Sequence, residues 1–239
     1  MDTISQLLAR KSVRRFLQKP VPEDVKQTLL ECAAAAPTAG NQQLYAVVDV
    51  TDPAIKAELA DICDHQGFIA DAPIVLVFLA DCRRWLDAYA LAGCAPRDPG
   101  LGDYYIAFCD ALIAAQNVVV AAHALGLGSC YIGDIVENRE RLVDLLGLDE
   151  FTVPATLLVL GYPTAQQLRR RKPARFPLAA VVHTDRYRRL TPDEQKAAFA
   201  AKGEAFDTFV PPFCRRKYES AFMAEMTRSM RAYLAPFRG

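Results

Sequence analysis

Hydrophobic and polar positions divide the chain into segments with the period of a helix or the length of a strand. Continuous apolar runs at 74–79 and 155–160 predict strands that are buried on both faces. Shorter runs predict further strands at 45–50, 129–132 and 180–183. Helical periodicity and capping residues predict helices over 3–10, 22–35, 53–63, 103–125, 138–146, from 192 onward, and over 215–234.

Loops separate these elements at 38–41, at a proline- and glycine-rich stretch over 95–102, and at a basic stretch over 166–177. Helices and strands mix throughout, without an internal repeat or a flexible linker. The pattern therefore predicts the α+β fold class. We expect one domain over residues 1–239 with a helical extension that covers 185–239.

The longest apolar helix contains polar residues that argue against a membrane span. Asp110, Gln116, Asn117 and His123 interrupt the run 106–125, which is typical of a buried core helix. The N-terminus lacks the charged region and the following apolar region of a signal peptide. We therefore expect a cytoplasmic protein that binds no membrane.

Charge and cysteine content narrow the classes of ligand. The 239 residues include 28 Lys and Arg and 28 Asp and Glu, so no overall field attracts nucleic acid. The seven cysteines form no CxxC pair and no Cys/His cluster with zinc spacing, so we expect reduced thiols and no metal site. Any anion site has to be local.

Residues 10–16 form a dense cationic segment at the end of the first predicted helix. Arg10, Lys11, Ser12, Arg14 and Arg15 supply three guanidinium groups, an ammonium and a hydroxyl. Guanidinium groups bind phosphate oxygens in a bidentate fork, so the segment is a candidate phosphate anchor. The alternative is a solvated basic surface. A second basic run at 169–175 either converges on the same anion or is a solvated loop.

The glycine-rich segment 126–133 does not match the dinucleotide-binding fingerprint. Tyr131 stands where GxGxxG requires glycine, and the first glycines follow a helix and open a strand. Gly133 and Asp134 end that strand before a helix, where their backbone N–H groups could point at an electron-rich ligand atom. The chain has no hydrolytic motif, so we expect a bound cofactor, such as a flavin, to carry the chemistry.

Six short motifs, in order along the chain, resemble the nitroreductase family. They are most similar to the branch of oxygen-insensitive NADPH nitroreductases and flavin reductase P, and the resemblance covers nearly the whole chain. The motifs are Arg10-Lys11-Ser12-Val13-Arg14-Arg15-Phe16, Ala36-Pro37-Thr38-Ala39-Gly40-Asn41-Gln42-Gln43, Gln66-Gly67-Phe68-Ile69-Ala70-Asp71-Ala72-Pro73, Gly126-Leu127-Gly128 with Tyr131-Ile132-Gly133, Gly161-Tyr162-Pro163, and Lys172-Pro173-Ala174-Arg175.

The resemblance implies an FMN-dependent homodimer with a mostly antiparallel sheet, flavin sites at the subunit interface and a C-terminal extension packed on the partner. It implies NADPH or NADH as reductant, ping-pong hydride transfer through flavin N5 to quinones, nitroaromatics or free flavin, and no catalytic side chain. The cofactor-binding residues that it implies are Arg10, Lys11, Ser12, Val13, Arg14, Gln66, Tyr131, Ile132, Gly133, Asp134, Lys172 and Arg175 of one subunit, with Pro37, Thr38, Ala39 and Asn41 of the partner.

Two features depart from the family's motifs. Ser129 and Cys130 replace a glycine and a valine before Tyr131, and the extra residue Ala174 leaves Arg171 as a substitute for Lys172 at the phosphate. Two other functions stay open: a flavin-binding carrier or sensor without turnover, and a reductive dehalogenase on the same fold.

Overall fold

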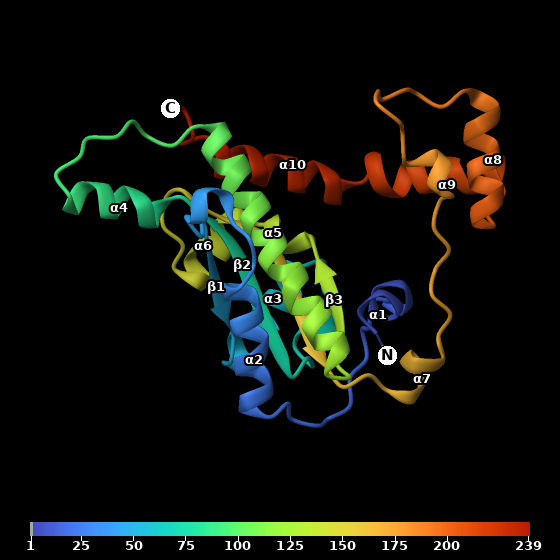
Figure 1. The fold of residues 1–239 in the computed structure, drawn as a ribbon, viewed down its shortest axis with the longest axis horizontal. Helices are drawn as coiled ribbons and strands as arrows, with labels where there is room; N and C mark the ends of the chain where they lie inside the picture. Colours follow the sequence, from blue (N-terminus) through green and yellow to red (C-terminus); the bar gives the residue numbers. More distant parts are fainter. Residues whose placement is uncertain (1) are drawn as a thin grey trace. The chain divides into compact units, whose positions relative to one another are not determined.

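A central antiparallel sheet organises the larger part of the chain. In the computed structural model, which describes residues 2–239, the strand order is β1-β2-β4-β3 (Figure 1). The strands are β1 (Tyr45–Asp49), β2 (Ile74–Asp81), β3 (Gly128–Ile132) and β4 (Thr152–Gly161). β2 is buried along its whole length and pairs with β1 and β4. The strand predictions from the continuous apolar runs are therefore confirmed.

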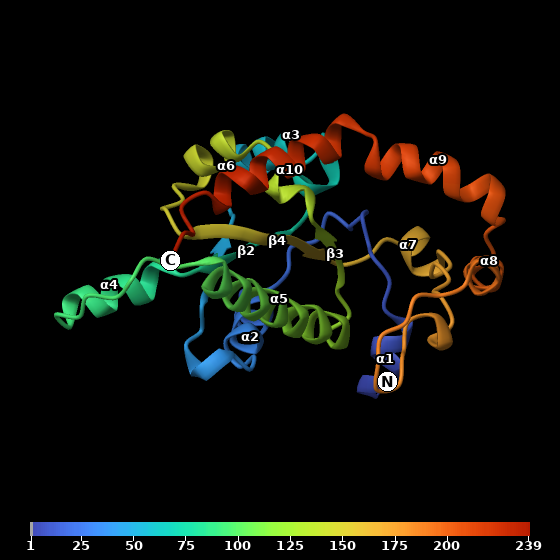
Figure 2. The same cartoon turned by 90° about the horizontal axis from the view of Figure 1, so that it is seen from above.

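Helices cover both faces of this sheet (Figure 2). On one face, α2 (Glu23–Ala34) and α5 (Leu101–Ala124) pack against apolar side chains of the strands such as Leu76 and Leu158. On the other face, α3 (Pro53–Ile62), α6 (Arg139–Leu146) and the C-terminal part of α10 (Ala221–Leu234) enclose a second core around Val75 and Val159. The predicted α+β class with flanking helices is confirmed.

α5 crosses the sheet as a core helix. Within residues 2–239 it is one helix that is long and apolar enough to span a membrane by length and composition. Its buried residues are mostly alanine and valine, so its backbone lies close to the strands. The prediction of a core helix is confirmed.

The chain divides into two compact units. The first comprises the residues up to 170 together with 225–239, and the second comprises residues 171–224. Within the expected C-terminal extension, Tyr233 and Phe237 belong to the first unit, where both side chains are buried.

The short helices of the first unit are α1 (Thr3–Ala9), α4 (Arg83–Leu91) and α7 (Ala165–Arg169), with 3-10 turns η1 (Ala39–Asn41), η2 (Gly67–Ile69) and η3 (Asp134–Val136).

The second unit is built around aromatic side chains. It contains η4 (Leu178–Ala180), α8 (Pro192–Lys202) and α9 (Phe206–Tyr218). The ring of Phe199 contacts Phe176, Phe206 and Phe209, with centroids 5.0, 5.2 and 6.1 Å away. The Lys202 ammonium lies 5.1 Å from the ring centroids of Phe176 and Phe209. This cluster is the small core of the unit.

Three sequence predictions about secondary structure are wrong. The expected strand at 180–183 is absent, because Val181 and Val182 are exposed and follow a 3-10 turn without a neighbouring strand. The expected helix 215–234 is two helices, since α9 ends at Tyr218 and α10 begins at Ala221. The stretch 166–177, expected to be irregular, begins within α7. In addition, α4 lies where no helix was predicted.

Candidate cofactor site

The N-terminal basic segment is fixed against the edge strand β3. Ser12 pairs with Ser129 in a parallel bridge, and the Val13 backbone N–H donates to the Ser129 carbonyl at 2.9 Å. The Val13 side chain is buried against Gly128, where an added Cβ would lie only 2.6 Å from Val13 Cγ2. Because side chains alternate along an extended segment, burial of Val13 directs Ser12 and Arg14 to the opposite side.

Arg10 is half-buried at the end of α1. Its Nη1 atom is buried and has no hydrogen-bond partner among residues 2–239. Burial lowers the pKa of His123, and the nearby Arg10 charge lowers it further. Burial raises the pKa of Tyr131 to about 12, while Arg10 acts in the opposite direction. A buried guanidinium nitrogen without an acceptor is costly, and an anion at this position would remove that cost.

Arg14 of the basic segment lies near Cys130 of β3. The Arg14 guanidinium carbon is 6.0 Å from the Phe68 ring centroid. The backbone N–H of Arg14 donates to Gln167 Oε1 at 3.3 Å. Burial raises the pKa of the Cys130 thiol, and the Arg14 charge and a hydrogen bond with Ser12 act against this. Cys130 therefore supports the basic segment from the strand below it.

The beginning of the second basic run lies beside the first. Lys11 Nζ donates to the Leu168 carbonyl at 2.7 Å and also to the Arg170 carbonyl. Arg170 Nη2 donates in return to the Ser12 carbonyl at 2.7 Å. Two of the ammonium N–H groups of Lys11 thus hold the C-terminal end of α7. Lys172 and Arg175 belong to the second unit, so their approach to the segment stays a prediction.

Gln66 meets the end of β3. Its side-chain Nε2 donates to the Cys63 carbonyl at 2.9 Å and to Asp134 Oδ2. Asp134 begins η3, directly after Gly133 at the end of β3. Tyr131 reaches away from this point, and its hydroxyl donates to Gln116 Oε1 of α5 at 3.1 Å. The structure therefore brings Gln66 and Asp134 together, although they lie 68 residues apart in the sequence.

The loop that contains Pro37, Thr38, Ala39 and Asn41 is held by a buried carboxylate of α5. The backbone N–H groups of Ala39 and Leu44 donate to Asp110 Oδ1 at 3.0 Å and to Asp110 Oδ2 at 3.3 Å. Asn41 has a φ of 57°, in the left-handed region, so the turn depends on this support. Sequence reasoning did not assign Asp110 this role, although its interruption of an apolar run was the available signal.

The two groups of predicted residues lie along different halves of α5. Asp110 is in the N-terminal half of the helix, whereas Arg10 lies against Val119, Val120 and His123 in the C-terminal half. With a rise of about 1.5 Å per residue, nine residues from Asp110 to Val119 correspond to about 14 Å. The loop and the basic segment are thus well separated within one subunit.

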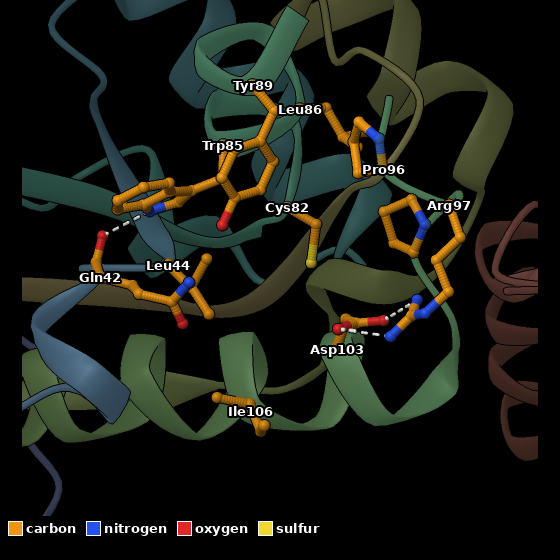
Figure 3. A pocket seen from close by; sticks show the side chains of 11 residues that line it. Gln42, Leu44, Cys82, Trp85, Leu86, Tyr89, Pro96, Arg97, Asp103 and Ile106 are labelled. Carbon is orange, nitrogen blue, oxygen red and sulfur yellow. Dashed lines mark hydrogen bonds and ion pairs between the residues drawn. The ribbon is translucent and has the colours of Figure 1, made fainter. Parts of the chain in front are cut away.

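A separate cavity of about 460 Å³ opens between α4, α5 and the loop before β1 (Figure 3). Trp85 and Tyr89 face into it from α4, and Trp85 Nε1 donates to the Gln42 carbonyl at 2.9 Å. Arg97 and Asp103 form an ion pair at its rim, with a distance of 2.7 Å. None of the predicted cofactor-binding residues lines this cavity.

A family model described as "Nitroreductase family" matches residues 7–162. An NADPH-flavin oxidoreductase of Vibrio harveyi is 32% identical over 198 residues, which cover 81% of this chain and 78% of that protein. An oxygen-insensitive NADPH nitroreductase of Salmonella typhimurium is 31% identical, covering 79% and 75%.

Solved structures of similar proteins agree over almost the full length. The NADPH:FMN oxidoreductase from Vibrio harveyi complexed with NAD+ has a TM-score of 0.84 at 26% identity and covers 97% of each chain. Nitroreductase A from Vibrio parahaemolyticus has a TM-score of 0.85 at 26% identity and covers 98% of each chain.

Proposed function

Because this chain belongs to the nitroreductase family and is an NAD(P)H-dependent flavoprotein oxidoreductase that uses FMN, we propose that it works by a ping-pong mechanism. NADPH or NADH and a flat acceptor, such as a quinone, a nitroaromatic compound or free flavin, would use one site in turn. FMN, when bound, supplies the hydride-accepting and hydride-donating atom. The residues of the chain bind and orient the cofactor.

The observation that carries the proposal is the buried, unpartnered Arg10 Nη1 in a segment whose Arg10, Ser12 and Arg14 all act on the Cys130 thiol. A phosphate monoester fits this donor set, because its oxygens accept several charge-assisted hydrogen bonds at once. We assign Arg10, Ser12 and Arg14 to the phosphate and the ribityl chain. Lys11 contributes at most its remaining N–H group, because two others bind the carbonyls of α7.

Backbone groups at the end of β3 would face the reactive edge of the flavin. We assign this role to the N–H groups at Gly133 and Asp134, with Tyr131 and Ile132 leading the strand to that point. Hydrogen-bond donors placed where negative charge develops stabilise a reduced flavin and favour hydride acceptance. No side chain has to act as a catalytic acid in this arrangement.

A second copy of the chain would complete the site. Leu101, Tyr105 and Ile113 lie on one face of α5, at intervals of four and eight residues, and are 59%, 67% and 40% exposed. A large apolar face of this kind on a core helix favours a homodimer. The loop 37–41 and Arg10 contact different halves of α5, and following the family resemblance we assign the loop to the flavin of the partner. Part of the segment 185–224 would also pack there.

Flavin content and reduction test the proposal. The purified protein should be yellow, should bleach when NADPH is added without oxygen, and should regain its colour when a quinone is added. A colourless protein that takes up no added FMN contradicts the proposal. A yellow protein that neither NADPH nor NADH reduces would instead be a flavin carrier.

A pair of arginine variants locates the phosphate. Arg10→Ala should raise the Kd for FMN by about 10- to 100-fold, which is typical of losing a charged partner of a bound anion. Arg15→Ala is the matched control, because the Arg15 guanidinium is exposed and bonds Gln166 Oε1 at 3.4 Å. An equal effect of both variants would mean that only net charge matters.

A further inference from the structure

The side-chain amide of Gln66 is held in one orientation. Its nitrogen donates to two acceptors, the Cys63 carbonyl and the Asp134 carboxylate. Neither of these groups has a hydrogen to donate, so the amide cannot be turned by 180° without losing both bonds. The amide oxygen of Gln66 must therefore point away from Cys63 and Asp134.

The backbone around Gln66 is fixed as well. The Gln66 N–H donates to the Ala60 carbonyl at 2.8 Å, and the Gln66 carbonyl accepts from the Ile69 N–H at 2.9 Å. The neighbouring Cys63 is fully buried in the sheet's core. The residue thus has one group left to bind a ligand, its side-chain oxygen, which accepts no hydrogen bond from residues 2–239.

Gln66 lies close to residues of the proposed flavin site. Phe68, two residues after Gln66, lies against the Arg14 guanidinium, and Asp134 follows directly on the end of β3. A carbonyl oxygen can only accept a hydrogen bond. FMN offers two kinds of matching donor, the N3–H of the pyrimidine ring and the hydroxyls of the ribityl chain.

We propose that Asp134 is a positioning residue that orients the Gln66 amide, so that its oxygen accepts a hydrogen bond from FMN. The proposal rests on the proposed function, since it takes FMN as the ligand. Asp134 acts through Gln66 and touches no reacting atom in this role. Without the carboxylate, the amide would populate the flipped orientation and offer the cofactor a donor where an acceptor is needed.

A double-mutant cycle tests the coupling of the two residues. The Kd for FMN is measured for the wild-type apoprotein, Asp134→Ala, Gln66→Ala and the double variant. We expect Asp134→Ala to raise the Kd about tenfold in the wild-type background and less than twofold in the Gln66→Ala background. An equal increase in both backgrounds would overturn the proposal, because Asp134 would then act independently of Gln66.

Two controls separate orientation from charge and from folding. Glu137→Gln removes a neighbouring carboxylate that makes no hydrogen bond with Gln66, so at pH 8 it should leave the Kd for FMN nearly unchanged. Asp134→Asn keeps the shape of the side chain and an acceptor oxygen, so its Kd should lie between those of the wild type and Asp134→Ala. A Glu137→Gln effect as large as that of Asp134→Ala would overturn the proposal.

Modified flavins identify the donor. If the N3–H is bound, the wild type should prefer FMN to N3-methyl-FMN and Gln66→Ala should lose this preference. If a ribityl hydroxyl is bound, the same loss should appear with a deoxyribityl analogue. A wild type that binds no FMN at all would refute the proposed function, whereas an additive cycle in a flavin-binding protein refutes only the role of Asp134.

Discussion

Glu137 carries a carboxyl group in surroundings that favour its neutral form. The residue is 6% exposed, and its Oε1 has no hydrogen-bond partner among residues 2–239. Burial, followed by the negative charges of Asp134, Asp64 and Glu225, raises the pKa of Glu137 to about 7. Between its ordinary value and pH 7, the folded protein keeps a proton that the unfolded chain releases, so the folded state loses stability as the pH rises.

Replacing this carboxyl should therefore stabilise the protein at high pH. We expect Glu137→Gln to raise the free energy of unfolding by roughly 1–3 kcal/mol at pH 8 and by much less at pH 5, where the wild-type group is protonated. Urea denaturation at both pH values measures the difference. Glu140→Gln is the control, since Arg228 lowers the pKa of Glu140 and the variant should show no such gain at pH 8. A gain from Glu137→Gln that does not change with pH would contradict this explanation.

At the level of single residues, the sequence indicated which side chains could bind a ligand, but not which groups they contact within the protein. Arg10 and Arg14 were predictable as anion-binding candidates because guanidinium groups bind phosphate oxygens in a bidentate fork, although a solvated basic surface was the alternative. The carbonyl partners of Lys11 lie 157 and 159 residues away, and no local pattern indicates them. The pairing of Gln66 with Asp134 is equally non-local, although the resemblance to the family had named both residues.

At the level of elements, burial decided what could be predicted. β2 and β4 were recognisable because strands that are covered on both faces require continuous apolar runs. The break between α9 and α10 was not recognisable, because amphipathic spacing continues across it. In the structure, the Ser220 hydroxyl accepts a hydrogen bond from the Met223 N–H at 3.4 Å, and a new helix begins there. α4 has no fully buried residue, but Trp85, Leu86 and Tyr89 line one side of it, an amphipathic spacing that the sequence prediction missed.

The contact between the basic segment and β3 is an element-level feature that one methyl group should break. In Gly128→Ala, the new Cβ would lie 2.6 to 2.9 Å from three atoms of the buried Val13 side chain. Because Val13 is joined to the strand by a backbone hydrogen bond to Ser129, the two segments would have to separate. We expect a loss of about 1–3 kcal/mol in the free energy of unfolding and weaker FMN binding.

Gly102→Ala provides the matched control for this prediction. Gly102 lies in the first turn of α5, where an added Cβ meets nothing within 4 Å. Alanine favours a helix more than glycine does, so this variant should be neutral or slightly more stable in thermal unfolding. A partial rescue of Gly128→Ala by Val13→Ala would confirm the clash, and its complete absence would speak against it.

At the level of the whole molecule, the order of motifs predicted the fold class and the family, whereas the division into two units was not predicted. The second unit, residues 171–224, holds its core through Phe199 and the aromatic side chains around it. These phenylalanines lie in polar helices and loops without a regular apolar period, so their association depends on the folded chain. Sequence patterns report such clusters poorly because the contacts are irregularly spaced.

The proposed homodimer makes a prediction that a single chain cannot satisfy. If each flavin takes Arg10 from one subunit and the loop at Asn41 from the other, Arg10→Ala and Asn41→Trp should each inactivate the homodimer when FMN is kept well below the raised Kd of Arg10→Ala. In a heterodimer of the two variants, one site then contains both defects and the other contains neither.

Equal mixing of the two inactive proteins should therefore restore activity. Random exchange makes about half of the dimers mixed, so about a quarter of all sites should be intact, and NADPH oxidation should recover to about that fraction. If Arg10 and Asn41 of one chain served the same flavin, every site in the mixture would keep one defect and no activity would return. Mixing Arg10→Ala with Arg14→Ala is the control, because these residues belong to one subunit's site and should not complement each other.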